Sequence, residues 1–171
     1  MYTLGMQPEQ VSGMVQYFLQ GLESEAKTTA RVVSAVPDDK GDYRPHPNSR
    51  SAKELAWHIV FTDVWFLDGI HKGAFNFEGE PIPADIQTSA DMVKWYETNV
   101  SEGIAKIRGM SADTLSETTD FFGMFKLPRG LYLGFLNNHM IHHRGQLSAY
   151  LRPMGAKVPS IYGPSGDEGM G

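Results

Sequence analysis

The 171-residue sequence contains no cysteine, which excludes a disulfide framework, a thiolate metal site and a cysteine nucleophile. Any metal ion bound by this chain must therefore have nitrogen or oxygen ligands. The sequence also lacks an apolar run approaching the roughly 18 residues that a membrane span requires. Its amino terminus has no basic segment followed by a long apolar stretch, so there is no sign of a secretory signal. We therefore expect a cytoplasmic protein with no membrane partner.

Basic residues are in the minority, because 15 Lys and Arg stand against 20 Asp and Glu, which gives a net charge of −5. No basic run with interleaved aromatic residues occurs, so nucleic-acid binding is not supported. Hydrophobic residues make up 41% of the chain, which argues for a packed core and against disorder. This length fits one domain. We expect residues 1–171 to form a single helical domain, with an extended C-terminal tail from about residue 156.

Apolar residues recur at helical spacing in several segments of the chain. The expected helices span about Gln7–Val33, Ser51–Ile70, Thr88–Met110 and Pro128–Arg152. Their expected core residues are Val11, Met14, Val15, Phe18, Leu22 and Ala26; Leu55, Ile59, Thr62, Phe66 and Ile70; and Met92, Tyr96, Val100, Ile104 and Ile107. A short helical turn at 111–115 and an extended piece at 119–127 are expected between the last two helices. The pattern predicts an all-α fold, a four-helix bundle with long connections.

Two of those connections are marked by glycine and proline, at Pro37–Pro47 and His71–Thr88. The second helix begins with Ser-Ala-Lys-Glu, which matches a capping box between Ser51 and Glu54. We therefore interpret Glu54 first as a capping residue. His71, at the far end of the same helix, suits the negative end of the helix dipole.

The segment Asn138–Gln146 carries the strongest functional signal. It places His139 and His143 four residues apart inside an apolar segment, so in a helix both rings leave the same face, with Cβ atoms roughly 6 Å apart. Two imidazole nitrogens at this spacing can share one metal ion. A hydrogen-bonded pair of core histidines is the alternative, because buried polar groups are normally satisfied in that way.

A metal ion held by two histidines of one helix needs a further protein ligand from a facing helix. His58 is the best candidate, since it lies in the middle of the second helix beside the apolar stripe. A core histidine with an ordinary hydrogen-bond partner is the alternative here as well. Three neutral imidazoles leave coordination positions open, which is typical of a catalytic site. An ion in such a site can lower the pKa of bound water or deprotonate a thiol.

Three segments give the chain a resemblance to a known family. They read SAKELAWHI from Ser51, HMIHHRGQL from His139 and VPSIYGPSGDE from Val158. Together they resemble the DinB/YfiT-like superfamily of bundle metalloproteins over nearly the whole length. The resemblance implies that His58, His139 and His143 bind a divalent metal ion, commonly zinc or nickel, and that the chain forms a homodimer. Members with assigned chemistry include transferases that use a low-molecular-weight thiol and a thiol-dependent isomerase.

Other polar residues near the histidines are expected to act outside the set of metal ligands. The sequence singles out no catalytic residue. His142 points about 100° away from His143 around the helix, so we expect it off the metal, in a helix contact, a hydrogen bond or a subunit interface. Arg144 is interpreted as a structural link before a substrate-binding group. Asn138 and Gln146 are candidates to orient an imidazole through its second nitrogen. The sequence does not place the tail residues Tyr162 and Asp167 relative to the metal ion.

Three alternative functions are compatible with these residues. The first is a metal-dependent enzyme that activates a cellular thiol for transfer of its sulfur to a small-molecule electrophile. The second is a metal-dependent hydrolase that uses metal-bound hydroxide, although the histidine motif lacks the glutamate of His-Glu-x-x-His proteases. The third is a non-enzymatic metal-binding module of a stress response, for which we expect an occluded ion with no pocket beside it.

Overall fold

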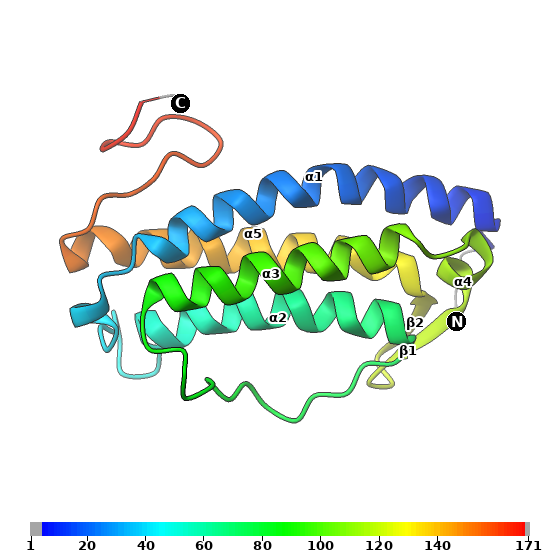
Figure 1. Ribbon diagram of the computed structural model, residues 1–171, viewed down its shortest axis with the longest axis horizontal. Helices are drawn as coiled ribbons and strands as arrows, with labels where there is room; N and C mark the ends of the chain where they lie inside the picture. The colour runs from blue at the N-terminus through cyan, green and yellow to red at the C-terminus, as the bar shows by residue number, and fades with distance from the viewer. Residues whose placement is uncertain (1–4, 170–171) are drawn as a thin grey trace.

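The computed structural model describes residues 5–169, and in this range four long helices lie side by side along the long axis of the molecule (Figure 1). They are α1 (Pro8–Ser34), α2 (Ala52–Lys72), α3 (Ser89–Arg108) and α5 (Tyr132–Leu151). Helix α2 packs against α3 and α5, and α1 packs against the same two helices from the other side. The predicted all-α bundle is confirmed, and the helix bounds agree with the expected ones to within a few residues except at the start of α5.

Shorter elements lie at the ends of the bundle. They are 3-10 turns at Asp38–Lys40, Arg129–Leu131 and Arg152–Met154, the helix α4 (Ala112–Ser116) and the strands β1 (Thr118–Phe121) and β2 (Phe125–Pro128). The two strands pair antiparallel, with Thr118 opposite Pro128 and Phe121 opposite Phe125. They form a hairpin beside α4 at one end of the bundle (Figure 1). The extended piece predicted at 119–127 is therefore a β-hairpin, and the predicted turn at 111–115 is α4.

The start of the fourth long helix differs from the prediction. Pro128 does not open this helix but ends β2, and α5 begins only at Tyr132, after the 3-10 turn Arg129–Leu131. The buried side chain of Arg129 donates a hydrogen bond to the carbonyl oxygen of His71 at the end of α2. Pairing within the hairpin and this tertiary contact fix the backbone here, and they override the preference of proline for a first helical turn.

The predicted apolar stripes form the core between the long helices. All five predicted residues of α2 and all five of α3 are buried. On α1, Met14 is an exception, with 40% of its surface exposed, Phe18 is only half-buried, and Leu19 is buried in addition to the predicted residues. Met14 lies at the edge of the stripe, because α1 packs on α3 and α5 alone among the long helices and leaves its outer side in water.

The ends of α2 are well defined. Ser51 accepts a hydrogen bond from the backbone N–H of Glu54, whose carboxylate accepts one from the backbone N–H of Ser51, so the predicted capping box is confirmed. At the other end, Gly73 adopts φ 73°, a left-handed conformation that glycine tolerates without strain. The chain then runs back along the bundle from Gly73 to Thr88 in an irregular connection, the green segment below the helices in Figure 1.

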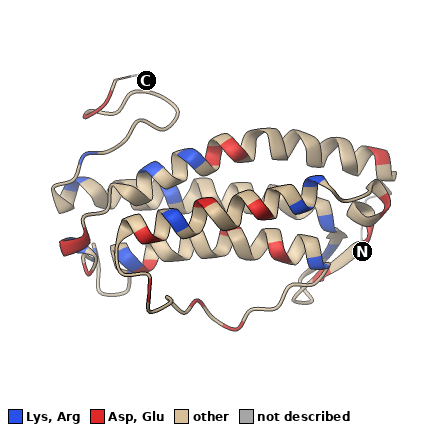
Figure 2. Ribbon diagram, viewed as in Figure 1, with Lys and Arg blue, Asp and Glu red and all other residues tan. Residues whose placement is uncertain are grey.

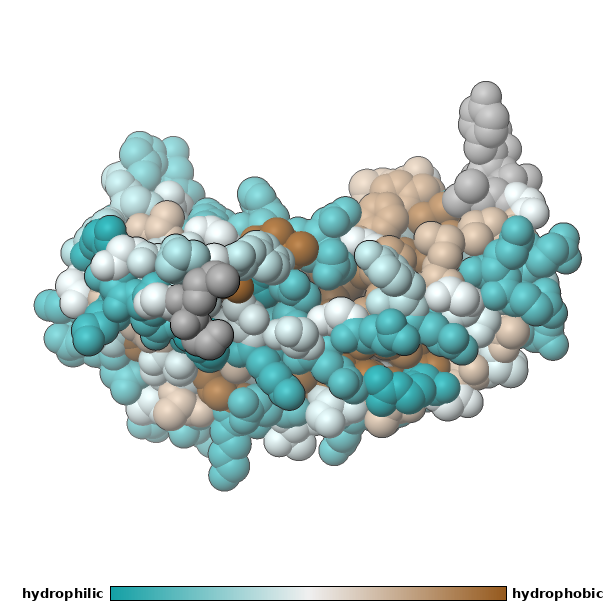
Figure 3. Space-filling model, turned by 90° about the horizontal axis from the view of Figure 1, so that it is seen from above, coloured by the Kyte–Doolittle hydropathy of each residue, from teal (hydrophilic) through white to brown (hydrophobic). Residues whose placement is uncertain are grey.

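Figure 2 shows Lys and Arg interspersed with Asp and Glu over the helices and the loops. Seen from above, the surface is mainly hydrophilic, with apolar side chains visible between the helices and a wider apolar area toward the end where α1 begins (Figure 3). Within residues 5–169, no helix combines the length and the apolar character that a bilayer span needs.

Substitutions at two glycines on different helices, Gly69 and Gly21, test the packing of the bundle. A Cβ atom added at Gly69 in α2 would clash with two ring atoms of Phe75, a buried side chain. We expect Gly69→Ala to lower the free energy of unfolding by about 1–3 kcal/mol, because the ring must move out of its packed position. At Gly21 in α1 an added Cβ meets no described atom within 4 Å. Gly21→Ala should raise stability by up to about 1 kcal/mol, because alanine favours the helix. Urea denaturation of both variants checks this, and a stable Gly69→Ala protein would contradict the close contact.

Candidate metal centre

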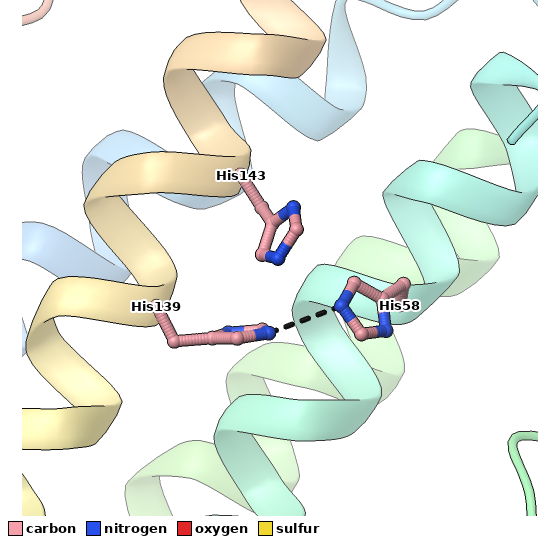
Figure 4. Close-up of side chains that lie close together, drawn as sticks. All are labelled: His58, His139 and His143. Atoms are coloured by element: carbon pink, nitrogen blue, oxygen red, sulfur yellow. Dashed lines mark hydrogen bonds between the residues drawn. The ribbon is translucent and has the colours of Figure 1, made fainter. Parts of the chain in front are cut away.

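The predicted histidines come together between α2 and α5. His58 lies on α2, and His139 and His143 lie one turn apart on α5. In Figure 4 one nitrogen of each ring points toward a common centre between the helices. One ligand atom from each ring can be chosen so that all lie within 4.8 Å of one another, and the Nε2 atoms of His58 and His139 are 3.0 Å apart. The three side chains are thus arranged as a group that could hold one ion.

Burial keeps these rings neutral. The side chains of His58 and His139 are 12% and 17% exposed. Desolvation lowers the pKa of His58, and it lowers the pKa values of His139 and His143 to about 4. All three rings are therefore unprotonated on one nitrogen at neutral pH. An uncharged imidazole with a free lone pair is the form that binds a metal ion.

Two of the rings have an oxygen partner on the side away from the centre. His58 Nδ1 lies 2.8 Å from Oε2 of Glu80, and His143 Nδ1 lies 3.0 Å from Oε1 of Gln146. The expectation that Gln146 orients an imidazole is therefore supported by a contact. Asn138 is exposed, and Gln146 rather than Asn138 is the amide beside a ring. Glu80 comes from the Gly73–Thr88 connection.

The third ring differs from the other two. His139 Nδ1 is buried and 3.8 Å from Oδ1 of Asp63, and within residues 5–169 neither atom has a hydrogen-bond partner. Asp63 is fully buried on α2, and its other oxygen accepts a hydrogen bond of 2.9 Å from the hydroxyl of Tyr96. Burial raises the pKa of Asp63 to about 8, although the bond from Tyr96 acts in the opposite direction.

These contacts fit a divalent cation. Two unprotonated imidazole nitrogens 3.0 Å apart repel each other unless a proton or a cation lies between them. A third nitrogen from His143 faces the same centre, and a single proton cannot serve all three lone pairs. The donor set is neutral nitrogen, with the carboxylate of Glu80 behind one ring, which suits zinc, nickel and related ions. The chain therefore has the residues that such an ion requires.

The remaining predicted residues lie outside this group. His142 is exposed, as expected for a residue that points away from the metal site. Arg144 is buried and pairs with Glu25 of α1 at 2.6 Å, while it donates to the hydroxyl of Tyr162 in the tail at 2.6 Å. Arg144 therefore links α5 to α1 and to the tail, as its structural interpretation predicts. Asp167 of the tail pairs with Arg152.

Sequence reasoning missed Glu80 and Asp63. Glu80 lies in an irregular connection that also contains the acidic residues Glu78 and Asp85, and no periodic pattern distinguishes it from them. Asp63 did offer a signal, because it is a charged residue within the apolar second helix, five positions after His58. A buried charge on such a helix needs a partner.

Comparisons with known proteins support this fold. The DinB family model matches residues 6–169. The chain belongs to the DinB family. It is 29% identical over 157 residues to the uncharacterized protein YrdA of Bacillus subtilis (strain 168), which covers 90% of this chain and 91% of YrdA. A DinB-like protein of Bacillus cereus has a crystal structure with a TM-score of 0.70 and 27% identity, over 85% of this chain and 95% of that one.

A more distant structural neighbour shows the fold alone. A variant of the mycothiol-dependent maleylpyruvate isomerase aligns with a TM-score of 0.54 and 10% identity, over 85% of this chain and 64% of that chain. The isomerase chain is therefore longer than this one, and it contains a helical bundle of the same fold.

The lowered pKa of His143 predicts an acid-sensitive fold. An unfolded imidazole binds its proton near pH 6.5, whereas folded His143 does so only near pH 4. As the pH falls through this window, the unfolded state binds more protons, so the free energy of unfolding decreases. Between about pH 7 and about pH 5, the metal-free protein should therefore lose more stability than His143→Gln. Urea denaturation at both pH values measures the difference, and equal losses in the two proteins would contradict the burial of this ring.

Proposed function

We propose that the chain is a metal-dependent enzyme in which His58, His139 and His143 bind one divalent ion, zinc or nickel. The observation that carries the proposal is the convergence of three neutral imidazole nitrogens within 4.8 Å. The proposed reaction is transfer of the sulfur of a low-molecular-weight thiol to a small electrophile. In such an enzyme the ion lowers the pKa of a bound thiol and so supplies a nucleophile near neutral pH.

The protein side chains have distinct tasks in this proposal. The three histidines hold the ion by nitrogen and add no charge, so the ion keeps its full positive charge for a bound ligand. Phe66 packs beside His139, with ring centroids 6.2 Å apart, and stacks on Phe121 of the hairpin at 6.0 Å. These rings give one side of the site an apolar wall. An apolar wall lowers the local dielectric constant and strengthens the effect of the ion on a bound group.

A hollow lies on the outer side of His58, next to Glu80. It has a volume of about 360 Å³, and Arg50, Trp57, Phe77 and Glu80 are among the residues that line it. Because Glu80 also contacts His58, the cavity lies directly behind a metal-site residue. Ligand cavities of enzymes commonly fall in this size range.

The thiol and water alternatives differ in what must be added. A hydrolase would use water and no thiol, and it needs a base placed near the ion, which the HMIHH segment does not contain in the manner of His-Glu-x-x-His proteases. The isomerase with the same fold is named as mycothiol-dependent, so this scaffold is compatible with a thiol cosubstrate. We therefore rank the thiol reaction first. The proposal further includes a homodimer in the cytoplasm, with no nucleic-acid partner.

Metal content of two histidine variants tests the ligand set. Protein purified without added metal should contain about one divalent ion per chain. The His139→Ala variant should lose that ion, because two imidazoles alone bind divalent metals weakly. His142→Ala is the matched control, since it removes an exposed neighbouring imidazole and should keep the ion. Elemental analysis measures both. An equal loss in the two variants, or none in His139→Ala, would rule out the proposed ligands.

Turnover with a chloroalkyl electrophile tests the reaction. Monochlorobimane is offered with each of several cellular thiols and with metal-loaded protein. The thiol sulfur forms the new carbon–sulfur bond, chloride leaves with the carbon–chlorine electron pair, and the thiol proton goes to the solvent. We expect fluorescence to rise faster than in the chelator-treated control for at least one thiol. If no thiol supports metal-dependent turnover, the S-transfer proposal is wrong. Turnover of ester or amide substrates without thiol would favour the hydrolase.

A further inference from the structure

Glu80 is held at three points although it lies in an irregular connection. One carboxylate oxygen is 2.8 Å from His58 Nδ1, and the other accepts a hydrogen bond of 3.1 Å from the guanidinium group of Arg50. Its backbone carbonyl accepts a hydrogen bond of 3.2 Å from the indole of Trp57. The side chain is 17% exposed. A residue bound by both side chain and backbone keeps its carboxylate in one place.

This carboxylate decides which nitrogen of His58 carries the proton. An ionised carboxylate only accepts hydrogen bonds, and the other oxygen of Glu80 accepts one from the guanidinium group of Arg50. A neutral imidazole has one N–H, so the contact places that hydrogen on Nδ1 of His58 and leaves Nε2 with a free lone pair. The hydroxyl of Thr62, 3.3 Å from the same Nδ1, is free to rotate and accept as well.

The free lone pair of His58 points to the centre of the site. Its Nε2 is the atom that lies 3.0 Å from His139 Nε2. The contact between His143 and Gln146 has the same consequence, because an amide oxygen accepts a hydrogen bond from Nδ1–H and leaves Nε2 unprotonated. Two rings from two different helices are thus set in the tautomer that a metal ion needs, each by an oxygen on its outer side.

We propose that Glu80 is a positioning residue for the metal site, which fixes the Nδ1–H tautomer and the orientation of His58 and so couples the Gly73–Thr88 connection to metal affinity. The inference rests on the proposed metal site for its effect on affinity, and on the contact with His58 alone for its effect on the tautomer. Carboxylates behind a metal-bound histidine commonly contribute 10–100-fold to metal affinity. Glu80 touches no substrate in this role and acts through His58.

A graded set of variants tests this role. Glu80→Ala removes the acceptor, and Glu80→Gln keeps an acceptor oxygen but loses the charge. Arg50→Gln keeps the carboxylate but removes its second partner. We expect the dissociation constant for Zn²⁺, measured by competition with a chromophoric chelator, to rise by about 10–100-fold in Glu80→Ala and by less in the other two. Glu78→Gln is the matched control, because Glu78 is an exposed acid of the same connection, and it should bind Zn²⁺ like the unaltered protein.

A second measurement needs no metal. Long-range ¹H–¹⁵N correlation spectra of the metal-free protein at pH 7.5 distinguish the two neutral tautomers of a histidine. In the unaltered protein His58 should be protonated on Nδ1, and in Glu80→Ala it should shift toward the Nε2–H form. The melting temperature of the metal-free variants should stay unchanged, which separates a positioning effect from a loss of structure.

The two measurements separate the failure of this inference from that of the proposed function. If the unaltered protein binds no Zn²⁺, the metal proposal fails, whereas a tautomer shift in Glu80→Ala still supports the role of Glu80 toward His58. If Zn²⁺ binds with equal affinity in all variants, or if His58 keeps the Nδ1–H form in Glu80→Ala, the role assigned to Glu80 is overturned even though the metal site stands.

Discussion

The packing of α2 against α5 is the constraint on which the candidate site depends. Imidazole side chains are short, so rings on two helices meet only where the helix axes approach within about 8–10 Å. Buried residues on either side of the histidines set that approach, among them Leu55 and Ile59 on α2 and Leu136 and Met140 on α5. Because these side chains are packed in the core, they hold the two helices at the separation at which the rings converge. The packing of the folded bundle therefore sets the positions of the three rings.

Charge is distributed around this point in a way that favours a cation. The three rings are neutral because burial lowers their pKa values. Glu80 stands behind the ring of His58, and the carboxyl group of Asp63, whose pKa is raised to about 8 by burial, stands behind the ring of His139. Arg50, whose charge lowers the pKa values of His58 and His139, is paired with Glu80. A divalent ion would thus meet neutral ligands, one of which, His58, is polarised by Glu80 from its outer side.

The parts of this structure that follow from local sequence patterns were predictable, and those that depend on distant contacts were not. Helical spacing located the long helices and placed His139 and His143 on one face, because i and i+4 neighbours are fixed by helix geometry alone. His58 needed the assumption of a facing helix and the family resemblance. Glu80 could not be found, because an irregular connection has no period, and its contact with His58 spans 22 residues. The false start of the fourth helix at Pro128 has the same origin, since hairpin pairing overrode a local proline preference.

Anomalous diffraction from crystals of protein purified without added metal tests the central claim most directly. The account predicts a single strong anomalous peak between α2 and α5, at about 2.0–2.2 Å from one nitrogen of each of His58, His139 and His143, with the Nε2 atoms as ligands of His58 and His143. A peak elsewhere would contradict it. So would a well-ordered site in metal-replete crystals where these rings bond only to each other and to neighbouring oxygens.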